Sequence, residues 1–395
     1  MKNLYLFSGL YPFNTFGDCF LEEEVDYLQK VFDHIFVIPY RKQTPNQKEL
    51  SEKFTILPPI LDGKIVFIIR GLFSRTGFRL LLPEFFRLRV FLNGNRLITF
   101  IKAYTFLNNL CNRHDIREIG EKLTPTDVCY FYWGKWGNML SVVWKDKARF
   151  VSRFHGEWDL WEESSGGCTP LRSKVANSLY MAAFVSRKGE QYFKDKYCVS
   201  NTYYAPLGSQ DMGMTTKSSD GIVRVFTCSS IIPLKRVPLV FDCINKFSER
   251  HQVEWTHIGG GDGFEELKQY VLDHCGKNLK PYLLGLLEHP KVVEYYKTAT
   301  IDLFMNLSTT EGVPVSIMEA ISCDIPVIAT NVGGTSEVVC SETGELVSEN
   351  PSIEEVVNAM EVAINKKYSC RHYWESHYNS EVNYTEFARM LVKGL

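Results

Sequence analysis

The chain has 395 residues, of which 45% are hydrophobic and 23% charged, an ordinary composition for a globular protein. Its 44 Lys and Arg nearly balance its 46 Asp and Glu, for a formal net charge of −2. Composition therefore excludes collagen, coiled coils and disordered chains, and the neutral total gives no support to a nucleic-acid partner. The length predicts two or three domains that can fold without disulfides.

Cysteine usage and the N-terminal residues bear on the compartment. The 11 cysteines are scattered, and no pair has the two-residue spacing of a zinc or redox site. Several lie in apolar stretches, which favours a reducing, cytoplasmic compartment. The apolar run at residues 4–7 is too short for a signal peptide, and no uncharged run of about 18 residues predicts a membrane-spanning helix.

The first forty residues alternate strand and helix signals. Residues 4–8 predict a strand, followed by a loop at 9–18. Residues 20–32 place apolar side chains on one helical face, and residues 35–39 predict the next strand. This order is typical of an α/β domain with a doubly wound parallel sheet.

Residues 64–117 combine positive charge with many bulky apolar residues. Ten basic residues accompany two acidic ones, a local excess of +8: Lys64, Arg70, Arg75, Arg79, Arg87, Arg89, Arg96, Lys102, Arg113 and Arg117 against Glu84 and Asp115. Such a mixture suits a surface that lies on anionic lipid. It equally suits helices that pack on a sheet and expose solvated arginines, so both interpretations stay open.

The rest of the chain repeats the α/β pattern on both sides of a polar stretch at 208–221, the best linker candidate. Strands are predicted at 128–132, 150–154, 184–186, 222–227, 255–258, 301–307 and 326–330. We therefore predict two α/β domains, 1–207 and 208–373. In such open sheets, ligands lie beyond the carboxyl ends of the strands.

Residues 301–347 carry the clearest chemical signal. A strand is followed by a turn containing Glu311 and Gly312, and Pro314 fits the first position of a helix at 315–321. Free N–H groups and the helix dipole favour an anion there, and Gly312 permits close approach. Glu311 and Glu319, roughly 10 Å apart by helix rise, are too distant for the carboxyl pair of a retaining glycosidase. We expect them to contact two parts of one extended ligand; two surface carboxylates are the alternative.

The stretch from Glu311 to Ala320, followed by residues 326–330 and 333–337, resembles glycosyltransferase family 4. That family contains retaining, nucleotide-sugar-dependent enzymes with the GT-B fold, and the match is its Glu–seven residues–Glu motif in context. The resemblance implies two Rossmann-like doubly wound domains that face a central cleft. It also implies that the C-terminal helix, 374–395, completes the first domain.

The resemblance assigns roles in donor binding. Glu319 would bind the ribose hydroxyls, and Glu311 would hold the transferred sugar together with the backbone of Gly312, Val313, Pro314 and Val315. Lys235, within 226–237, matches the lysine that meets the donor diphosphate. Ser230 stands where the family often has an arginine, so that cationic contact is missing or is supplied by Arg236. An exposed loop lysine is the alternative for Lys235.

Three further segments resemble the family. His155 lies in a His-Gly segment that implies contact with the transferred sugar, although a lone histidine after a strand is more often structural. Gly259 and Gly260 belong to a second glycine turn; as a dinucleotide fingerprint it lacks the third glycine, and a tight loop is the simple interpretation. Gly17 stands in the N-terminal loop where the pattern usually offers adjacent glycines.

The resemblance implies a nucleotide-diphosphate sugar as co-substrate and retention of the anomeric configuration. We expect no cofactor and no metal, because the sequence offers no Asp-x-Asp site and fixed cations could stabilise the leaving diphosphate. The acceptor is expected to be a glycan or a lipid-linked glycan in bacterial surface polysaccharide synthesis. Residues 64–117 would then touch the inner face of the cytoplasmic membrane.

Three other functions fit parts of the sequence. The GT-B scaffold also serves nucleotide-sugar epimerases, and Ser230 would suit a nucleotide-sugar-binding protein that has lost activity. A nicotinamide-dependent oxidoreductase on two Rossmann-like halves is the third, against which the incomplete glycine fingerprint argues.

Overall fold

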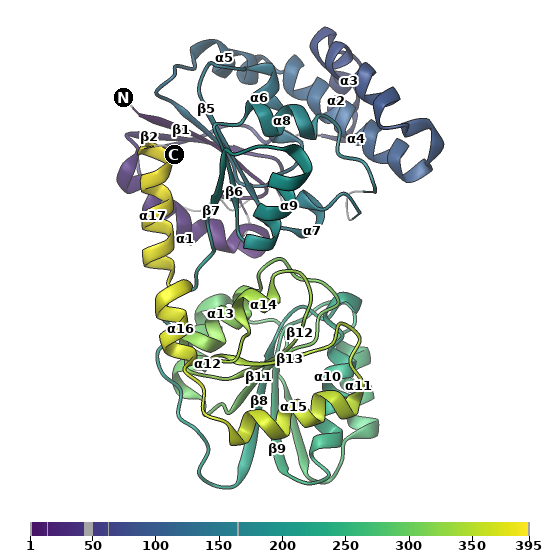
Figure 1. Ribbon diagram of the computed structural model, residues 1–395, viewed down its shortest axis with the longest axis vertical. Coiled ribbons are helices and arrows are strands. Elements are labelled where there is room, and N and C mark those ends of the chain that lie inside the picture. The colour runs from purple at the N-terminus through teal and green to yellow at the C-terminus, as the bar shows by residue number, and fades with distance from the viewer. Residues whose placement is uncertain (1, 14, 43–49, 62, 164–165, 394–395) are drawn as a thin grey trace. The chain divides into compact units, whose positions relative to one another are not determined.

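The computed structural model describes residues 2–13, 15–42, 50–61, 63–163 and 166–393 (Figure 1). These residues form two compact units. Unit 1 comprises Met1–Ala205 with Tyr384–Leu395, and unit 2 comprises Pro206–Asn383. Each unit is built on its own parallel sheet, as the alternating strand and helix signals predicted.

Unit 1 contains a sheet of seven described strands in the order β3-β2-β1-β4-β5-β6-β7, with every neighbouring pair parallel. The strands are β1 (Asn3–Ser8), β2 (His34–Pro39), β3 (Phe54–Ile56), β4 (Val128–Phe131), β5 (Arg149–Phe154), β6 (Met181–Phe184) and β7 (Thr202–Tyr204). The helices are α1 (Thr15–Val31), α2 (Lys64–Gly71), α3 (Arg75–Arg87), α4 (Gly94–Asn112), α5 (His114–Lys122), α6 (Leu140–Val143), α7 (Glu157–Leu160), α8 (Arg172–Ser178), α9 (Arg187–Tyr197) and α17 (Ser380–Lys393), with short 3₁₀ turns η1 (Val90–Leu92) and η2 (Gly137–Met139).

Unit 2 contains a sheet of six described strands in the order β10-β9-β8-β11-β12-β13, again all parallel. The strands are β8 (Ile222–Cys228), β9 (Gln252–Ile258), β10 (Leu279–Leu283), β11 (Leu303–Asn306), β12 (Val327–Thr330) and β13 (Gly344–Val347). The helices are η4 (Pro233–Lys235), α10 (Val237–Phe247), α11 (Phe264–His274), α12 (His289–Thr298), α13 (Val315–Ser322), α14 (Thr335–Val338), α15 (Ile353–Asn365) and α16 (Cys370–His377).

Apolar side chains cover both faces of each sheet, which is why the interior strands are nearly continuous hydrophobic runs. In unit 1, α1 and α17 bury Leu21 and Phe387 on one face, and α4 buries Leu107 on the other. In unit 2, α10, α11 and α15 share one core. On the opposite face, the rings of Tyr295 and Tyr296 in α12 lie 4.9 and 5.1 Å from that of Phe226 in β8.

Two local predictions are wrong. The strand expected at 184–186 is Met181–Phe184, and Ser186 instead accepts a hydrogen bond from the Gly189 N–H as the N-cap of α9. Gly17, expected in a loop, lies in the first turn of α1, which begins at Thr15. Thr15 and Asp18 are polar, so the apolar periodicity that located the helix starts later than the helix itself.

Residues 208–221, which were predicted to be a linker, form hydrogen bonds and an ion pair with helix α16 of unit 2. Trp374 Nε1 donates to Ser209 Oγ at 2.8 Å, and the Arg371 guanidinium pairs with both oxygens of Asp211 at 2.6 and 2.7 Å. These bonds hold Ser209 and Asp211 against α16. Consequently residues 374–383 group with unit 2, whereas the prediction placed all of 374–395 with the first domain.

Candidate functional site

Four loops meet at the carboxyl edge of the sheet in unit 2, where ligands bind in open α/β sheets. They follow β8, β9, β11 and β12, and span residues 229–236, 259–263, 307–314 and 331–334. Backbone hydrogen bonds of 2.8–2.9 Å join them: Ile231 N–H to Gly260 O, Thr309 N–H to Leu234 O, and Gly334 N–H to Gly312 O. The loops therefore form one connected surface.

Lys235 and Glu311 meet at the centre of these loops. Lys235 Nζ lies 2.6 Å from Glu311 Oε1, and Glu311 is only 7% exposed. Asn306 Nδ2 donates to the same carboxylate oxygen at 3.1 Å, while Asn306 Oδ1 accepts from the backbone N–H and hydroxyl of Ser308. A buried carboxylate needs such partners. The pair brings together two residues that are 76 apart in sequence and that sequence analysis assigned to one site.

The Arg236 guanidinium is engaged in hydrogen bonds to the backbone of the loops. Its Nε donates to Leu307 O at 2.6 Å, and its Nη2 donates to Ser308 O and Glu349 O at 2.9 and 2.8 Å. Partial burial lowers the pKa of this guanidinium. Backbone carbonyls thus accept hydrogen bonds from the Arg236 guanidinium, which was predicted to replace the missing arginine at the diphosphate. Ser230 itself is exposed in the loop after β8.

Two glycine turns let the loops approach one another. Gly259 has φ 153°, and a Cβ there would stand 1.7 Å from Ser229 O. Gly333 has φ 55°, and a Cβ there would stand 1.7 Å from Glu311 O. Both positions exclude any larger residue. A Cβ on Gly260 would instead meet Leu286 Cβ at 3.1 Å, so Gly259 and Gly260 help to position the loops on which any ligand would rest.

Helix α13 begins beside Glu311. Val315 is its first residue, as predicted, and Pro314 is its N-cap and not its first helical residue. Gly312 is partly exposed, whereas Val313, Pro314 and Val315 are buried. The helix start therefore places backbone N–H groups and positive dipole potential next to the Lys235–Glu311 pair.

Glu319, in the second turn of α13, has a partner that the sequence did not indicate. His289 Nε2 lies 3.0 Å from Glu319 Oε1, and the two side chains are 53% and 9% exposed. His289 is the first residue of α12, directly before Pro290. Burial and the nearby Glu319 carboxylate raise the pKa of the Cys228 thiol at the end of β8 to about 12.

His155 belongs to unit 1, directly after β5. The Asp159 carboxylate accepts from the backbone N–H of His155 at 3.0 Å and from that of Gly134 at 3.0 Å, and lies 3.4 Å from His155 Nδ1. The imidazole also contacts the rings of Tyr132 and Trp133, at 4.7 and 4.5 Å between centroids. Among the described residues, Nε2 of His155 is buried without a hydrogen-bond partner. Asp159 therefore orients the imidazole ring and leaves its other nitrogen buried and unsatisfied in this structure.

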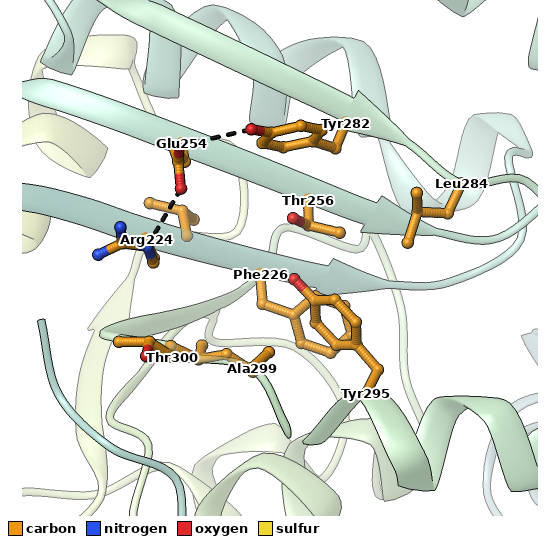
Figure 2. A pocket seen from close by; sticks show the side chains of 11 residues that line it. Arg224, Phe226, Glu254, Thr256, Tyr282, Leu284, Tyr295, Ala299 and Thr300 are labelled. Carbon is orange, nitrogen blue, oxygen red and sulfur yellow. Dashed lines mark hydrogen bonds and ion pairs between the residues drawn. The ribbon is translucent and has the colours of Figure 1, made fainter. Parts of the chain in front are cut away.

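A separate cavity of about 300 Å³ lies on the face of β8, β9 and β10 that α12 partly covers (Figure 2). Figure 2 shows Tyr295 and Phe226 at one side and the chain Arg224–Glu254–Tyr282 at the other. This cavity includes none of the predicted site residues. Within the described residues, no three His, Cys, Asp or Glu side chains cluster in a way that could hold a metal ion.

One segment of the chain contains the four loops, the Lys235–Glu311 pair and the start of α13, and this segment matches a known protein family. Residues 218–379 match the family Glycosyl transferases group 1. This match covers the loops of unit 2 and leaves unit 1 outside it.

Curated proteins with related sequences include glycosyltransferases. The GPI3 subunit of phosphatidylinositol N-acetylglucosaminyltransferase from Saccharomyces cerevisiae is 29% identical over 41% of this chain and 35% of its own length. The O-antigen biosynthesis glycosyltransferase WbnH of Escherichia coli is 33% identical over 27% of this chain and 28% of its own. The chain thus spans about a third of the length of these relatives.

Solved glycosyltransferases share the fold over the whole chain. The lipopolysaccharide outer core galactosyltransferase WaaB has a TM-score of 0.65 at 14% identity, with 99% of both chains covered. Sucrose-phosphate synthase from Thermosynechococcus elongatus has a TM-score of 0.67 at 15% identity, covering 99% of this chain and 98% of the other. The predicted fold class is confirmed: two Rossmann-like units, as in GT-B glycosyltransferases.

Proposed function

We propose that this protein is a retaining glycosyltransferase that moves a sugar from a nucleotide-diphosphate sugar to a glycan or lipid-linked acceptor. The observation that carries the proposal is the contact of Lys235 with the buried Glu311 carboxylate beside the start of α13, inside the segment that matches group 1 glycosyltransferases. A lysine, a helix start and a buried carboxylate together suit a ligand that has both phosphate and sugar groups.

The diphosphate of the donor would compete with Glu311 for Lys235. The Lys235 side chain is 22% exposed, so phosphate oxygens can reach its ammonium. Its positive charge, with the N–H groups at the start of α13, would stabilise the leaving diphosphate as the glycosidic bond breaks. The Glu311 carboxylate, released from Lys235, would accept hydrogen bonds from hydroxyls of the transferred sugar.

Glu319 would bind the ribose through its two carboxylate oxygens. Oε1 contacts His289, while Oε2 has no hydrogen-bond partner among the described residues. A carboxylate can accept from two vicinal hydroxyls at once. In this proposal His289 holds Glu319 in the orientation that the ribose needs. His155, oriented by Asp159, would contact the sugar through Nε2.

The acceptor class is proposed from the relatives. Their names describe transfer to phosphatidylinositol, to a phosphatidylinositol monomannoside and in O-antigen biosynthesis. Two of these names specify phosphatidylinositol lipids. We therefore propose a lipid-linked or glycan acceptor in polysaccharide assembly, with neither metal nor cofactor taking part.

Donor binding tests the site directly. In titration calorimetry, Glu319→Ala should weaken nucleoside diphosphate binding by at least tenfold, because a hydrogen bond to a charged group contributes about 1.5–3 kcal/mol. The wild type should also prefer UDP or GDP over the 2′-deoxy forms, and the variant should not. Glu294→Ala, an exposed glutamate on α12, is the matched control. Equal affinity of Glu319→Ala and wild type for every nucleotide tried would contradict the assignment.

A nucleotide-sugar-binding protein without transfer activity is the second candidate. The observation that favours it is the exposed Ser230 with Arg236 engaged elsewhere, which leaves Lys235 as the cation that the loops present beside Glu311. Mass spectrometry separates the two: transfer releases nucleoside diphosphate and adds a sugar to a lipid extract, whereas a binding protein leaves the donor intact. Epimerised donor would instead indicate an epimerase.

A further inference from the structure

One part of unit 1 exposes far more apolar side chain than the rest of the chain. Fourteen of the 23 large apolar side chains that are exposed among the described residues lie between residues 65 and 101. They are Ile65, Val66, Ile68, Ile69, Leu72, Phe73, Phe78, Leu82, Phe86, Phe91, Leu92, Leu97, Ile98 and Ile101. We call these fourteen residues the apolar surface. Leu72 and Phe73 directly follow α2, and the others belong to α2, α3, η1 and the first half of α4, in the blue helical region of Figure 1.

The helices are anchored to the core by their opposite faces. In α3, Phe78, Leu82 and Phe86 recur every four residues and are exposed, whereas Leu81 and Glu84 are buried. In α4, the first half exposes apolar residues while the second half packs in the core. A helix on the protein surface normally presents a polar face to water. Apolar residues on the outward face therefore indicate a partner.

Ring contacts join α3 to the elements on either side of it. The Phe73 ring after α2 lies 5.9 Å from that of Phe78 in α3. At the other end of α3, Phe85 lies 5.4 Å from Phe86 and 6.2 Å from Phe91 in η1. The exposed rings thus gather in two clusters, one at each end of α3, and are not scattered single residues.

Charge within this region has one sign. Residues 65–102 contain seven basic residues and one acidic residue, Glu84, which is 3% exposed. The Glu84 carboxylate is directed inward, where it accepts from Arg87 and from the Leu171 N–H. Arg75, Arg79, Arg89 and Lys102 are exposed. The outer side of α2–α4 therefore carries positive charge and no exposed acidic side chain.

We propose that the apolar surface docks on an anionic phospholipid bilayer, with its rings in the interfacial layer and its arginines at the lipid phosphates. Charge decides between occupants: a second copy would bring two positive surfaces together in an isologous contact, whereas anionic lipid neutralises them. No described helix is long and apolar enough to cross a membrane, so α2–α4 lie along the interface.

The docking surface is narrower than the segment 64–117. Arg113 is 5% exposed, and it pairs with Asp115 and donates to the carbonyls of Pro58 and Pro59. It is therefore part of the fold. Membrane docking by this surface does not depend on donor binding. Only the purpose of docking, which is to bring a lipid-linked acceptor to unit 1, rests on the proposed function.

Vesicle co-sedimentation of the full chain tests the proposal. We expect binding to vesicles containing phosphatidylglycerol at low salt, weaker binding at high salt, and weak binding to phosphatidylcholine alone. The triple variant Phe86→Ser, Phe91→Ser, Leu97→Ser should lose affinity by about tenfold or more, and Arg75→Gln with Arg79→Gln by roughly fivefold per charge. Leu272→Ser with Val382→Ser, equally exposed elsewhere, and Arg117→Gln should bind like wild type.

Several outcomes would overturn the docking proposal. One is no binding of the wild type to anionic vesicles at low salt; another is equal loss in surface and control variants. Light scattering that shows a dimer, abolished by the triple variant while vesicle binding persists, would assign the surface to a second copy. Nucleotide titrations on the same variants keep the two proposals separate, because unaltered nucleotide binding with lost vesicle binding affects docking alone.

Discussion

At the residue scale, the Lys235–Glu311 pair is the centre of the candidate site. A carboxylate that is 7% exposed is stable only with a partner, and here a lysine and an asparagine supply it. The same lysine is the cation best placed to meet a diphosphate beside α13. In our proposal, donor binding therefore exchanges one anion for another at Lys235, while Asn306 keeps Glu311 in place.

Replacing this lysine tests its role in the reaction. Lys235→Gln should lower the turnover number by about 10²–10³, because an uncompensated diphosphate is a poor leaving group. The measurement is release of nucleoside diphosphate under saturating donor. Lys246→Gln, on the exposed side of α10 and paired with Glu249, is the matched control and should keep full activity. Turnover that survives in Lys235→Gln would remove Lys235 from the mechanism.

Sequence reasoning located most of the candidate site but not all of it. It named Lys235 and Glu311, which the structure places in contact. It missed His289, because one histidine before a proline looks like any helix start until the fold sets it beside Glu319. It offered Arg236 as a phosphate contact, and only the folded loops reveal the carbonyls that occupy its guanidinium.

At the element scale, the sheets explain which strands could be predicted. Each of the eight strands predicted near its correct position is an interior strand of its sheet. The four strands that were not predicted, β3, β7, β10 and β13, are the four edges. An edge strand is half-exposed and short, so it needs no continuous apolar run: β7 is Thr-Tyr-Tyr and is nowhere fully buried. Position in the sheet, not local sequence, defines these strands.

The buried ion pair between β5 and α1 predicts a large stability effect. Arg153 pairs with Glu24, both fully buried, and Tyr130 donates to the same carboxylate at 2.9 Å. Glu24→Gln should lower the free energy of unfolding by about 3–5 kcal/mol, because it leaves a buried guanidinium without its counter-charge. Urea denaturation measures this.

A double variant is the control for that prediction. Glu24→Met with Arg153→Met removes both charges and should recover most of the lost stability. If the double variant were as unstable as the sum of the two single variants, the cause would be lost packing and not an unpaired charge.

Strand β9 contributes a pH dependence through His257. This histidine is fully buried, its Nδ1 lies 2.8 Å from Thr227 Oγ1, and burial lowers its pKa to about 4. Between pH 6.5 and 4 the unfolded chain binds a proton that the folded chain refuses, so stability falls as pH falls through this range, by roughly 3 kcal/mol.

Replacing the histidine should flatten the profile. In urea denaturation from pH 7 to 4, His257→Gln should show a smaller loss of stability than wild type, whatever its stability at pH 7. His274→Gln, an exposed histidine at the end of α11, should retain the wild-type slope. An unchanged slope in His257→Gln would show that other groups cause the dependence.

At the scale of the whole molecule, the near-neutral total charge conceals a strong separation. Residues 65–102 carry a formal +6, so the remaining chain carries −8 of the total −2. We expect stopped-flow association with anionic vesicles to slow steeply as ionic strength rises, even though the protein is acidic overall. An association rate independent of salt would mean that the apolar side chains alone drive docking.

Because the Glu84 carboxylate points inward, the outer side of α2–α4 is purely positive, and this separation of charge can orient the molecule at a membrane. An anionic membrane repels the acidic majority of the chain and attracts α2–α4, so most encounters in the wrong orientation dissociate before any side chain enters the lipid. The protein would therefore rotate until α2–α4 face the membrane before it binds. Fluorophores attached in turn to residue 91 and to residue 272 would report it, since only the first should be quenched by a membrane-embedded quencher.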